Sequence, residues 1–443
     1  MLLFLCVVSM RIVVVETVWH GGSRYAAFER FYLTVFGIYP SLHARQIASI
    51  CASSGHEVVV ASERFGPLPY DVPWDLVIVH ATLSATPHGI EIAKGFQSRG
   101  NRVVFAGYLG NVYPEEILSA VDSVLQGRGE LEVVDCLLDV ESDSLKKIYS
   151  SKLYDESVSL PALKMNSSAF SLVAPVEATR GCPHRCDFCM ECGMNKKPQY
   201  FKRPVEEVVA EISALPQKFV MFYDESLTID SSYAVELFEA LRPLKKHFFC
   251  NGNVGVLGSD FELVKKSREA GCISWLVGFE SFSAESLGEV GKSSNELALY
   301  KQAVDNIHSC DMSVIGSFMF GFDGESKEVF SKTLKAIDAL GIDAADFNVL
   351  TPIPGTPLFD RLEEQNRILS RDWTKYNMHE VLFMPHSMSC DELKSGVDWL
   401  YKQFYAPKNY ICSSLISLKR GLYPSLLVLA RLGVAFSMGM KKK

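Results

Sequence analysis

The sequence has no excess of positive charge. Its 44 lysine and arginine residues are outnumbered by 52 aspartate and glutamate residues, and its formal net charge is -8. Proteins that bind nucleic acid neutralise phosphates with clustered lysine and arginine side chains. The acidic balance therefore disfavours a nucleic-acid partner, and we expect a small-molecule substrate instead.

The sequence also lacks the marks of a secreted protein. Its 12 cysteines are scattered and form no compact disulfide framework, which indicates a reducing compartment. Residues 1–10 are mostly apolar, but they have no basic segment at their start and no small-residue cleavage site. We interpret them as an extension of the strand expected at Arg11–Val15, or as residues upstream of the true initiator, Met10. The expected location is cytoplasmic.

Three closely spaced cysteines after an extended apolar run give the strongest signal in the chain. Cys182, Cys186 and Cys189 have the spacing C-x3-C-x2-C, and Phe188 precedes the last of them. This spacing favours three thiolates around one cuboidal iron–sulfur cluster. Clusters that only carry electrons usually have a fourth cysteine ligand, so a three-cysteine set leaves one iron open to bind a substrate or cosubstrate.

Two other interpretations of these cysteines stay open. The first is a structural zinc site, for which Cys189 and Cys192 supply one C-x2-C pair, but zinc usually takes four ligands and no further pair follows nearby. The second is a set of buried free cysteines. We expect Cys192 to be a bystander, because a fourth ligand would close the iron that the chemistry needs open.

Residues 11–140 alternate short apolar runs with amphipathic helices. The runs are typical of strands buried in a parallel sheet. This alternation predicts a flavodoxin-like, doubly wound α/β domain over residues 1–140, which would bind a ligand at the carboxyl ends of its strands. The five expected strands are Arg11–Val15, Glu57–Val60, Asp75–Val79, Arg102–Phe105 and Ser123–Gln126.

Residues 141–171 are polar and aperiodic, and we expect them to form a linker. Residues 172–365 then repeat a strand-and-helix unit about six times, which favours a barrel or an open α/β sheet. An eight-stranded barrel needs about 250 residues, so this span predicts a partial barrel of six units. Its first strand ends near Val176, and the others are expected at Phe219–Phe222, His247–Cys250, Ile273–Val277, Met312–Phe320 and Asp346–Leu350.

Residues 366–443 are expected to be a helical C-terminal extension, since helical spacing dominates and strand patterns disappear. The stretch 422–440 is strongly apolar and has basic residues on both sides. Its length approaches that of a membrane span, but Arg431 and Pro424 within it argue against spanning. A helix lying on a membrane surface is one expectation, and a helix packed on the barrel is the alternative.

The cysteine loop and its surroundings resemble the radical S-adenosylmethionine (SAM) superfamily. In that superfamily, a three-cysteine loop after the first strand of a partial (β/α)6 barrel holds a 4Fe-4S cluster, whose open iron binds the methionine part of SAM. The resemblance implies that Cys182, Cys186 and Cys189 are the cluster ligands. It also implies that SAM is cleaved reductively to a 5′-deoxyadenosyl radical, with the cofactors carrying the chemistry while the protein binds and orients them.

The N-terminal part is similar to the cobalamin (B12)-binding-type domain that precedes many radical SAM cores. The similarity depends on Gly55–Val58, Ala106–Gly107, Pro114–Glu116 and Gly127–Glu130, and on the strand that starts at Asp75. The C-terminal extension is similar to that of cobalamin-dependent radical SAM methylases such as hopanoid methylases. Together these similarities imply that cobalamin is a further cofactor.

Two departures from this pattern count against cobalamin. The chain has no D-x-H-x-x-G motif, and His20 in the first loop does not have the spacing needed to ligate cobalt. Relatives commonly carry Gly-Gly-x-His-x-Thr where this chain has Ala106–Asn111, which lacks the histidine. Cobalamin would then bind through shape and backbone contacts, and a domain that keeps the fold without the corrin is the alternative.

Four polar residues at strand ends are the candidates for contacts to SAM. Asp224 and Glu225 follow the second barrel strand, where the resemblance implies a contact to the SAM amino group, and a carboxylate suits an ammonium. Glu280 and Ser281 follow the fourth strand, where the resemblance implies contacts to the ribose or carboxylate of SAM. The alternative for each pair is a helix cap, since serine and acidic residues favour helix N-termini.

These inferences lead to three hypotheses of function. The first is a cobalamin-dependent radical SAM methyltransferase that acts on an unactivated carbon of a hydrophobic substrate, such as a lipid or tetrapyrrole, with an external electron donor such as flavodoxin or ferredoxin. The second is a radical SAM enzyme without cobalamin that catalyses cyclisation, rearrangement or methylthio transfer, which the missing loop histidine favours. The third is a non-catalytic binding protein held by zinc or a cluster.

Overall fold

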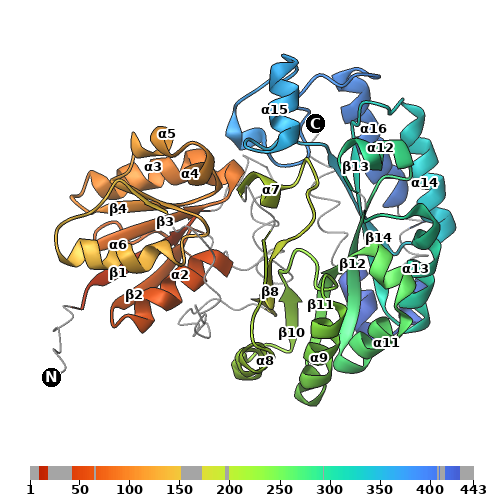
Figure 1. Cartoon of the computed structure of the whole chain (residues 1–443), viewed down its shortest axis with the longest axis horizontal. Helices are drawn as coiled ribbons and strands as arrows, with labels where there is room; N and C mark the ends of the chain where they lie inside the picture. Colours follow the sequence, from red (N-terminus) through yellow and green to blue (C-terminus); the bar gives the residue numbers. More distant parts are fainter. Residues whose placement is uncertain are drawn as a thin grey trace. The chain divides into compact units, whose positions relative to one another are not determined.

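The computed structural model describes residues 9–17, 42–63, 66–150, 172–194, 199–292, 294–406, 409 and 415–429. These residues divide into two compact units (Figure 1). Unit 1 contains the described residues between 9 and 150 together with Asp372–Lys375, and unit 2 contains those from 172 to 371 and from 376 to 429.

Unit 1 is built on a six-stranded parallel sheet with the strand order β2-β1-β3-β4-β5-β6. Its first five strands have the flavodoxin-like order, which confirms the predicted fold. Strand β3 is buried at every residue, as expected where helices cover both faces of a sheet. The strands are β1 (Arg11–Glu16), β2 (Glu57–Ser62), β3 (Leu76–Ala81), β4 (Val103–Gly107), β5 (Ser123–Gln126) and β6 (Ile148–Ser150).

The sixth strand lies in the segment that the sequence pattern predicts to be a linker. Ile148–Ser150 pairs in parallel with residues 124–126 of β5, so the predicted count of five strands is wrong and the sheet continues beyond residue 140. A three-residue edge strand is too short to show a hydrophobic period, which is why the pattern misses it.

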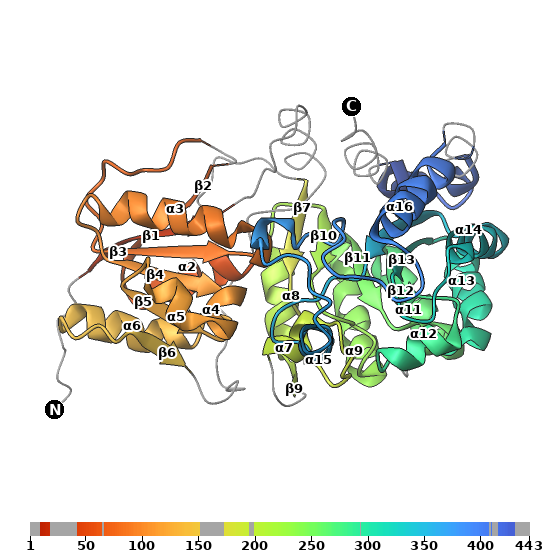
Figure 2. The ribbon, with the colours of Figure 1, turned by 90° about the horizontal axis from the view of Figure 1, so that it is seen from above.

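Helices cover both faces of the unit 1 sheet, as Figures 1 and 2 show. Helices α2 and α6 share one apolar cluster with the strands, to which Ile47 and Val133 contribute. Gly89 of α3 lies against Val79 and Ala81, which point to the opposite face. The helices are α2 (Leu42–Ser53), η1 (Leu83–Ala85), α3 (Thr86–Gln97), α4 (Tyr108–Val112), α5 (Pro114–Leu118) and α6 (Glu132–Glu141).

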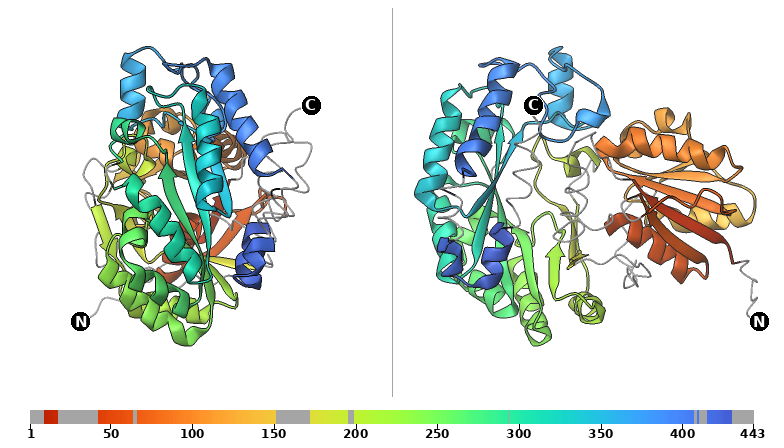
Figure 3. Two further views of the ribbon diagram at one scale, coloured as in Figure 1. Left: turned by 90° about the vertical axis from the view of Figure 1, so that its right-hand side faces the viewer. Right: turned by 180° about the vertical axis from the view of Figure 1, so that it is seen from behind.

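Unit 2 contains a second sheet of six parallel strands in sequential order, β14-β13-β12-β11-β10-β7. Figure 3 shows the helices on its outer face. The edge strands β7 and β14 have no pairing with each other, which is the partial barrel that the sequence predicts. The strands are β7 (Val173–Val176), β10 (Phe219–Phe222), β11 (His247–Gly252), β12 (Cys272–Glu280), β13 (Ser313–Phe320) and β14 (Ala344–Val349).

Amphipathic helices follow these strands and bury their apolar sides against the sheet. Phe238 and Trp275, for example, meet edge to face in the large core of this unit. The helices are α8 (Val205–Ala214), α9 (Ser231–Leu241), η2 (Arg242–Leu244), α10 (Val254–Ser259), α11 (Phe261–Ala270), α12 (Ala284–Glu289), η3 (Leu297–Leu299), α13 (Tyr300–Ser309) and α14 (Glu328–Leu340).

The inner face of the partial barrel is only partly buried. Burial alternates along the last strands, because one side chain in two packs against the helices while the next points inward. The inward set is mixed, with apolar residues beside amides and one carboxylate. Its partly exposed members are Met221, Phe249, Asn251, Leu276, Ser317, Met319, Asp346 and Asn348.

Two further pieces complete unit 2. A short antiparallel pair, β8 (Thr179–Cys182) and β9 (Gln199–Lys202), follows β7 and encloses helix α7 (Met190–Met194). The C-terminal extension is largely helical as predicted, with α15 (Pro357–Glu364) and α16 (Cys390–Phe404), and it adds one isolated bridge between Ile368 and Phe383. The segment η4 (Trp373–Lys375) belongs to unit 1.

The end of the chain is partly described, because residues 430–443 lie outside the described residues and with them half of the predicted apolar stretch. Residues 415–429 are anchored at Asp343, a buried carboxylate just before β14. It accepts a hydrogen bond from Ser417 and pairs with Arg420. Among the described residues, no helix has both the length and the apolar character that crossing a bilayer requires.

Candidate active site

The three predicted cluster cysteines lie in one loop at the carboxyl ends of the unit 2 strands. Cys182 ends β8, where the hairpin pairs it with Gln199. Cys186 is buried, and its carbonyl accepts a hydrogen bond from the Cys189 amide at 2.9 Å. The hairpin fixes the start of the loop and this turn fixes its end, so the local fold holds all three thiols in one region.

The electrostatic surroundings of the three thiols are shared. Burial is the main reason why the pKa of each is raised, and Cys186 raises it further at both Cys182 and Cys189. Lys292 acts in the opposite direction on Cys182 and Cys186. Metal binding requires thiolates, so three neighbouring thiols with one cation beside them fit a cluster that takes over their charge.

A single metal ion is held by several ligand side chains that converge on it. Among the described residues, no group of three or more histidine, cysteine, aspartate or glutamate side chains converges on one position for an ion. A cuboidal cluster places each thiolate on a different iron, and does not need such convergence. The zinc interpretation therefore has no ligand set in the described part of the chain.

Cys192, the predicted bystander, lies in helix α7. Its thiol donates a hydrogen bond to the His184 carbonyl at 3.7 Å. Burial, followed by the nearby Cys186 and Cys182, raises the pKa of this thiol to about 11. Cys192 is thus close to the cysteine loop, and its role as a bystander stays a prediction.

Asp224 faces the backbone at the start of the cysteine loop. Its carboxylate accepts hydrogen bonds from the amide of Ala178 at 3.1 Å, from the amide of Thr179 at 2.5 Å and from the Thr179 hydroxyl at 2.6 Å. Burial raises its pKa to about 7 against the effect of these donors. Both oxygens therefore already hold β8 in place, so the contact to SAM stays a prediction for a residue with a structural task.

Glu225 has a different environment from its neighbour. It is exposed, and its charge raises the pKa of both Cys182 and Cys189. The carboxylate is therefore both accessible to solvent and close enough to two of the cysteines to act on their charge. Of the two acidic residues after β10, Glu225 is better placed to bind an ammonium group.

Glu280 combines three unusual features at the end of β12. Its backbone has a φ of 61°, a left-handed conformation that costs free energy in a residue other than glycine. Its Oε1 atom lies 3.2 Å from Nζ of Lys292. Its Oε2 atom is buried and has no hydrogen-bond partner among the described residues. An unsatisfied buried oxygen at a strained position is a feature of ligand sites.

Ser281 is hydrogen-bonded to the loop that follows β13. Its hydroxyl donates to Oε1 of Glu325 at 3.4 Å and accepts from the amide of Ser283 at 3.2 Å. Glu325 in turn accepts from the amides of Gly321 and Phe322. Ser281 is thus part of a buried network that shapes the next loop, while Ser283 caps α12, and the SAM contact of Ser281 stays a prediction.

Lys292 is a functional candidate that the sequence does not indicate. Burial alone would lower its pKa, but Glu280, Cys186 and Cys189 outweigh that effect and raise it. The ammonium also lies 6.0 Å from the ring centroid of Phe188, beside the third cysteine. A single lysine after a turn has no motif, so only the fold brings it to the cysteines.

A buried ion pair lies in the segment that leads into the cysteine loop. Nε of Arg180, in β8, lies 2.8 Å from Oε2 of Glu177, and both side chains are buried. Arg203 donates to the Glu177 carbonyl at 2.6 Å and pairs with Glu211 at 2.8 Å. Such pairs are costly to break from one side, so they fix the path of the chain into the loop.

A second candidate site lies at the carboxyl edge of the unit 1 sheet. His80, the second-last residue of β3, pairs with Glu16 of β1, where the strand order reverses and flavodoxin-like sheets bind ligands. Its ring is buried and stacks on that of His43 with centroids 5.9 Å apart. Burial lowers the pKa of His80 to about 4, so the ring is neutral and hydrogen-bonds readily to an uncharged ligand.

The neighbouring strand end, at Gly107, packs tightly against β3. A Cβ atom at Gly107 would lie 2.3 Å from the carbonyl oxygen of Ala81, so only glycine fits there. The Asn111 side chain donates to the Gly127 carbonyl at 2.9 Å and closes this edge. His80 lies at the edge where flavodoxin-like sheets bind ligands, and the sequence candidate His20 lies outside the described residues.

Comparison with known proteins defines the class of this site. Residues 176–337 match the model of the radical SAM superfamily, and residues 356–413 match a domain family of unknown function, DUF4070. Residues 176–337 therefore form a radical SAM domain, as the partial barrel and the cysteine loop indicate. Enzymes that contain such a domain use a 4Fe-4S cluster and SAM, act on small molecules and need a reductant.

Two of the relatives with similar sequences are methyltransferases by name. The bacteriochlorophyllide d C-12(1)-methyltransferase of Chlorobaculum tepidum is 26% identical over 369 residues, which cover 80% of each chain. The hopanoid C-2 methylase of Rhodopseudomonas palustris is 24% identical over 51% of this chain and 44% of its own. Both are named for transfer of a methyl group to a carbon atom.

Two solved structures share the fold. The radical SAM methyltransferase TsrM from Kitasatospora setae, with cobalamin and a 4Fe-4S cluster bound, has a TM-score of 0.66 at 16% identity and covers 81% of this chain and 78% of its own. The cobalamin-dependent SAM radical enzyme OxsB has a TM-score of 0.66 at 12% identity over 98% of this chain and 76% of its own. At these identities, the likeness concerns the fold.

Proposed function

We propose that the protein is a cobalamin-dependent radical SAM methyltransferase that methylates an unactivated carbon of a hydrophobic small molecule. The observation that carries the proposal is the cysteine loop, in which three thiols share one environment with Lys292, Glu225 and Glu280 at the carboxyl ends of a partial barrel. The flavodoxin-like sheet in the same chain supports the second cofactor.

The residues of unit 2 have distinct tasks in this proposal. Cys182, Cys186 and Cys189 would hold the cluster, which supplies the electron for reductive cleavage of SAM. The exposed carboxylate of Glu225 would bind the SAM ammonium, and Lys292 would bind the SAM carboxylate while it balances the charge of Glu280. Flavodoxin or ferredoxin is the proposed electron donor.

Cobalamin has a proposed site in unit 1. His80 would hydrogen-bond to it from the carboxyl end of β3, beside the tight contact between Gly107 and Ala81. When bound, cobalamin would serve as the carrier of the methyl group. The absence of the D-x-H-x-x-G motif means that the cobalt would have no histidine ligand from that loop.

The proposed substrate class is a tetrapyrrole. Two methyltransferases of Chlorobaculum tepidum named for bacteriochlorophyllide d each cover about four fifths of this chain. The inner face of the barrel also suits an amphipathic ring system, because Phe249, Leu276 and Met319 are apolar while Asn251 and Asn348 can hydrogen-bond to polar substituents. A lipid of the hopanoid kind is the second substrate to test.

The test is an anaerobic assay with SAM labelled in its methyl group, a reductant and either a tetrapyrrole or a hopanoid. We expect label on a carbon of the tetrapyrrole, and only when cobalamin is present. Label transfer without cobalamin would contradict the cofactor assignment. A product that is cyclised or rearranged without label would contradict methylation and favour the second hypothesis.

The end of the described chain supports a membrane-surface location on the cytoplasmic side. In residues 415–429 the buried positions include Ser417, Ser425 and Val428. Most of the outward positions are apolar, namely Leu415, Ile416, Leu418, Leu422, Leu426 and Leu429, and Lys419 is the charged exception. This inverted pattern matches a helix that lies against lipid, and the basic residues that follow at 441–443 would favour anionic headgroups.

Vesicle binding tests this location. The full chain should sediment with vesicles that contain anionic lipid, and the double variant Leu422→Glu, Leu426→Glu should lose this binding. Leu369→Glu changes an equally exposed leucine elsewhere in unit 2 and should keep it. Equal binding by all three proteins would overturn the membrane contact.

A further inference from the structure

We infer that the domain of unknown function at residues 356–413 is a clamp on the cluster loop, with Arg361 as its positioning residue. The inference rests on the proposed cluster ligands, and it assigns a task to a segment that the reaction itself does not explain. The clamp consists of helix α15 and the residues after it that contact Asp187, Glu289 and Asp323.

The first observation is that Asp187 is held from outside its own loop at three points. It directly follows Cys186. Its amide donates to the Val290 carbonyl at 3.0 Å, and its carbonyl accepts from the Leu358 amide at 3.0 Å. Its carboxylate Oδ2 lies 2.9 Å from NH1 of Arg361. Two of these three contacts come from α15, which lies more than 160 residues further along the chain.

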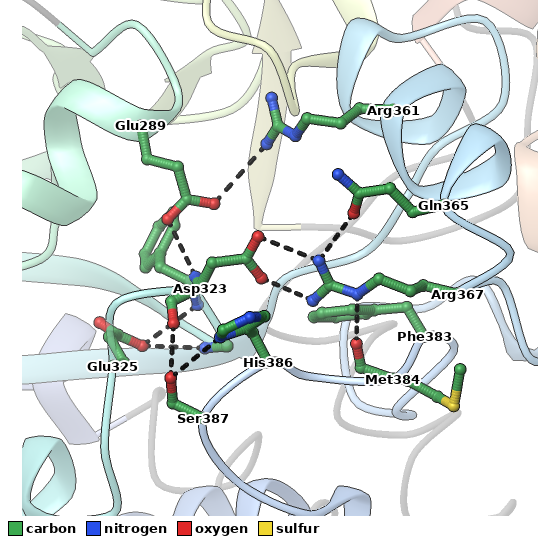
Figure 4. Close-up of polar contacts among 12 residues, drawn as sticks. Glu289, Asp323, Glu325, Arg361, Gln365, Arg367, Phe383, Met384, His386 and Ser387 are labelled. Carbon is green, nitrogen blue, oxygen red and sulfur yellow. Dashed lines mark hydrogen bonds and ion pairs between the residues drawn. The ribbon is translucent and has the colours of Figure 1, made fainter.

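The second observation is that Arg361 joins two carboxylates. NH2 of Arg361 lies 3.6 Å from Oε1 of Glu289 at the end of α12 (Figure 4). Glu289 accepts from the Asp323 amide at 2.9 Å, and burial raises its pKa. One guanidinium therefore pairs with two partly buried acids beside the cluster loop, and its loss would remove the ion-pair partner of both.

The third observation is that the network continues into the rest of the extension. Arg367 forms a two-point ion pair with Asp323, with distances of 2.5 and 3.0 Å. Its Nε donates to the Met384 carbonyl at 2.8 Å. Figure 4 shows this chain of contacts from Glu289 to Met384. Bidentate arginine–carboxylate pairs are geometrically specific, so the extension is tied to the carboxyl ends of the barrel strands in one orientation.

The apolar contacts of α15 make this idea testable without unfolding the helix. Leu358, Phe359 and Leu362 are buried and dock the helix on the barrel. The Arg361 side chain is 30% exposed, so a shorter polar residue leaves no cavity in the core. Substitution should release the cluster loop while the helix stays in place.

The experiment measures hydrogen–deuterium exchange of the cluster-free full chain. In Arg361→Gln and in Asp187→Asn, we expect the amides of residues 183–192 to exchange about tenfold faster than in the wild type. The reason is that local opening of the loop costs less free energy once the ion pair is lost. The double variant should be no faster than Arg361→Gln alone, because both substitutions remove the contact between Arg361 and Asp187. Arg361→Lys should be intermediate, since it keeps the charge and loses the fork.

Arg371→Gln is the matched control. Arg371 belongs to the same extension and pairs with Glu363 of α15. Its side chain is exposed, and its ion pair does not involve a residue of the cluster loop. It should leave exchange at 183–192 unchanged. After anaerobic reconstitution, Arg361→Gln should also retain less iron per chain than this control, with both variants unfolding at similar temperatures.

The clamp is overturned if Arg361→Gln leaves loop exchange at the wild-type rate, or if the effects of Arg361→Gln and Asp187→Asn add. It is also overturned if exchange rises over the whole chain, since that is general destabilisation. Failure of the proposed function is distinct, because wild-type protein that binds no cluster would contradict the enzyme while exchange in cluster-free protein would still report on the clamp.

Discussion

The ammonium group of Lys292 lies 3.2 Å from Oε1 of Glu280, and the same cation lowers the pKa of the thiols of Cys182 and Cys186 against the effect of burial. One lysine therefore balances a buried carboxylate and two proposed cluster ligands. The contact links the end of β12, the fourth barrel strand, to the cysteine loop. We therefore expect the positive charge of Lys292 to matter for binding of both the cluster and SAM.

Lys292→Gln tests that balance. Without the cation, Glu280 loses its partner and the proposed site for the SAM carboxylate disappears. We expect the KM for SAM to rise about tenfold, equivalent to ~1.4 kcal/mol, with less iron retained per chain. Steady-state kinetics and iron analysis measure both effects. Lys301→Gln, which removes an exposed lysine paired with Asp305, should change neither, and a normal KM in Lys292→Gln would contradict the role.

Substitution of single cysteines tests the ligand set. Cys186→Ser should lower SAM cleavage by at least about a hundredfold, because a serine hydroxyl does not replace a thiolate as a cluster ligand. Cys192→Ser is the matched control in the same loop region and should keep both cluster and cleavage. Formation of 5′-deoxyadenosine is the readout. Loss of the cluster in Cys192→Ser would show that this thiol is a ligand and not a bystander.

Asp224→Ala tests whether that residue holds the loop. The variant leaves the amides of Ala178 and Thr179 without their acceptor, which should cost about 1–3 kcal/mol of unfolding free energy. Denaturant unfolding of the cluster-free protein measures this loss. Glu225→Ala should leave stability unchanged and raise the KM for SAM. If Asp224→Ala were as stable as the wild type and raised only the KM, Asp224 would be the SAM contact instead.

Acidity should release the C-terminal segment. Burial would raise the pKa of Asp343, but the hydrogen bond and charge of His308 and the charge of Arg420 outweigh it and lower the pKa below its ordinary range. A depressed folded-state pKa means that Asp343 adds stability above the unfolded-state pKa. That stability falls as pH drops through the lower folded-state value.

Limited proteolysis at residues 415–429 measures this release. Cleavage should be slow at neutral pH and faster below about pH 4 in the wild type, while Asp343→Asn should be cleaved quickly at every pH. If the wild type were cleaved at the same rate at pH 3 and pH 7 by an acid-tolerant protease, Asp343 would not anchor the segment.

Much of the fold follows from local patterns. The apolar runs at Arg11–Val15 and at Ile273–Val277 are parallel strands as predicted, because a strand buried on both faces leaves a continuous hydrophobic signature. Ile148–Ser150 leaves no such signature, and neither does the hairpin that places Cys182. Short or polar strands depend on their pairing partners, which the local sequence does not specify.

The candidate site also contains some residues that the sequence indicates and others that only the fold brings together. Cys182, Cys186 and Cys189 are close in sequence, so their spacing alone indicates their chemistry. The contact of Arg361 with Asp187 joins residues 174 positions apart, and Lys292 reaches the cysteines only because α12 turns back toward them. From the sequence, Asp224 is an acidic residue after a strand and therefore a candidate ligand contact. In the structure its carboxylate accepts hydrogen bonds from the amides of Ala178 and Thr179, which the sequence pattern does not reveal.

The most direct test of the account is one anaerobically purified sample, examined for iron, sulfide, corrin absorbance and cleavage of SAM. The account predicts four irons per chain, corrin bands from bound cobalamin and 5′-deoxyadenosine formed on reduction, all but the corrin bands lost in Cys186→Ser. Protein that takes up no iron and sulfide, or that holds a cluster and leaves SAM intact, would contradict it.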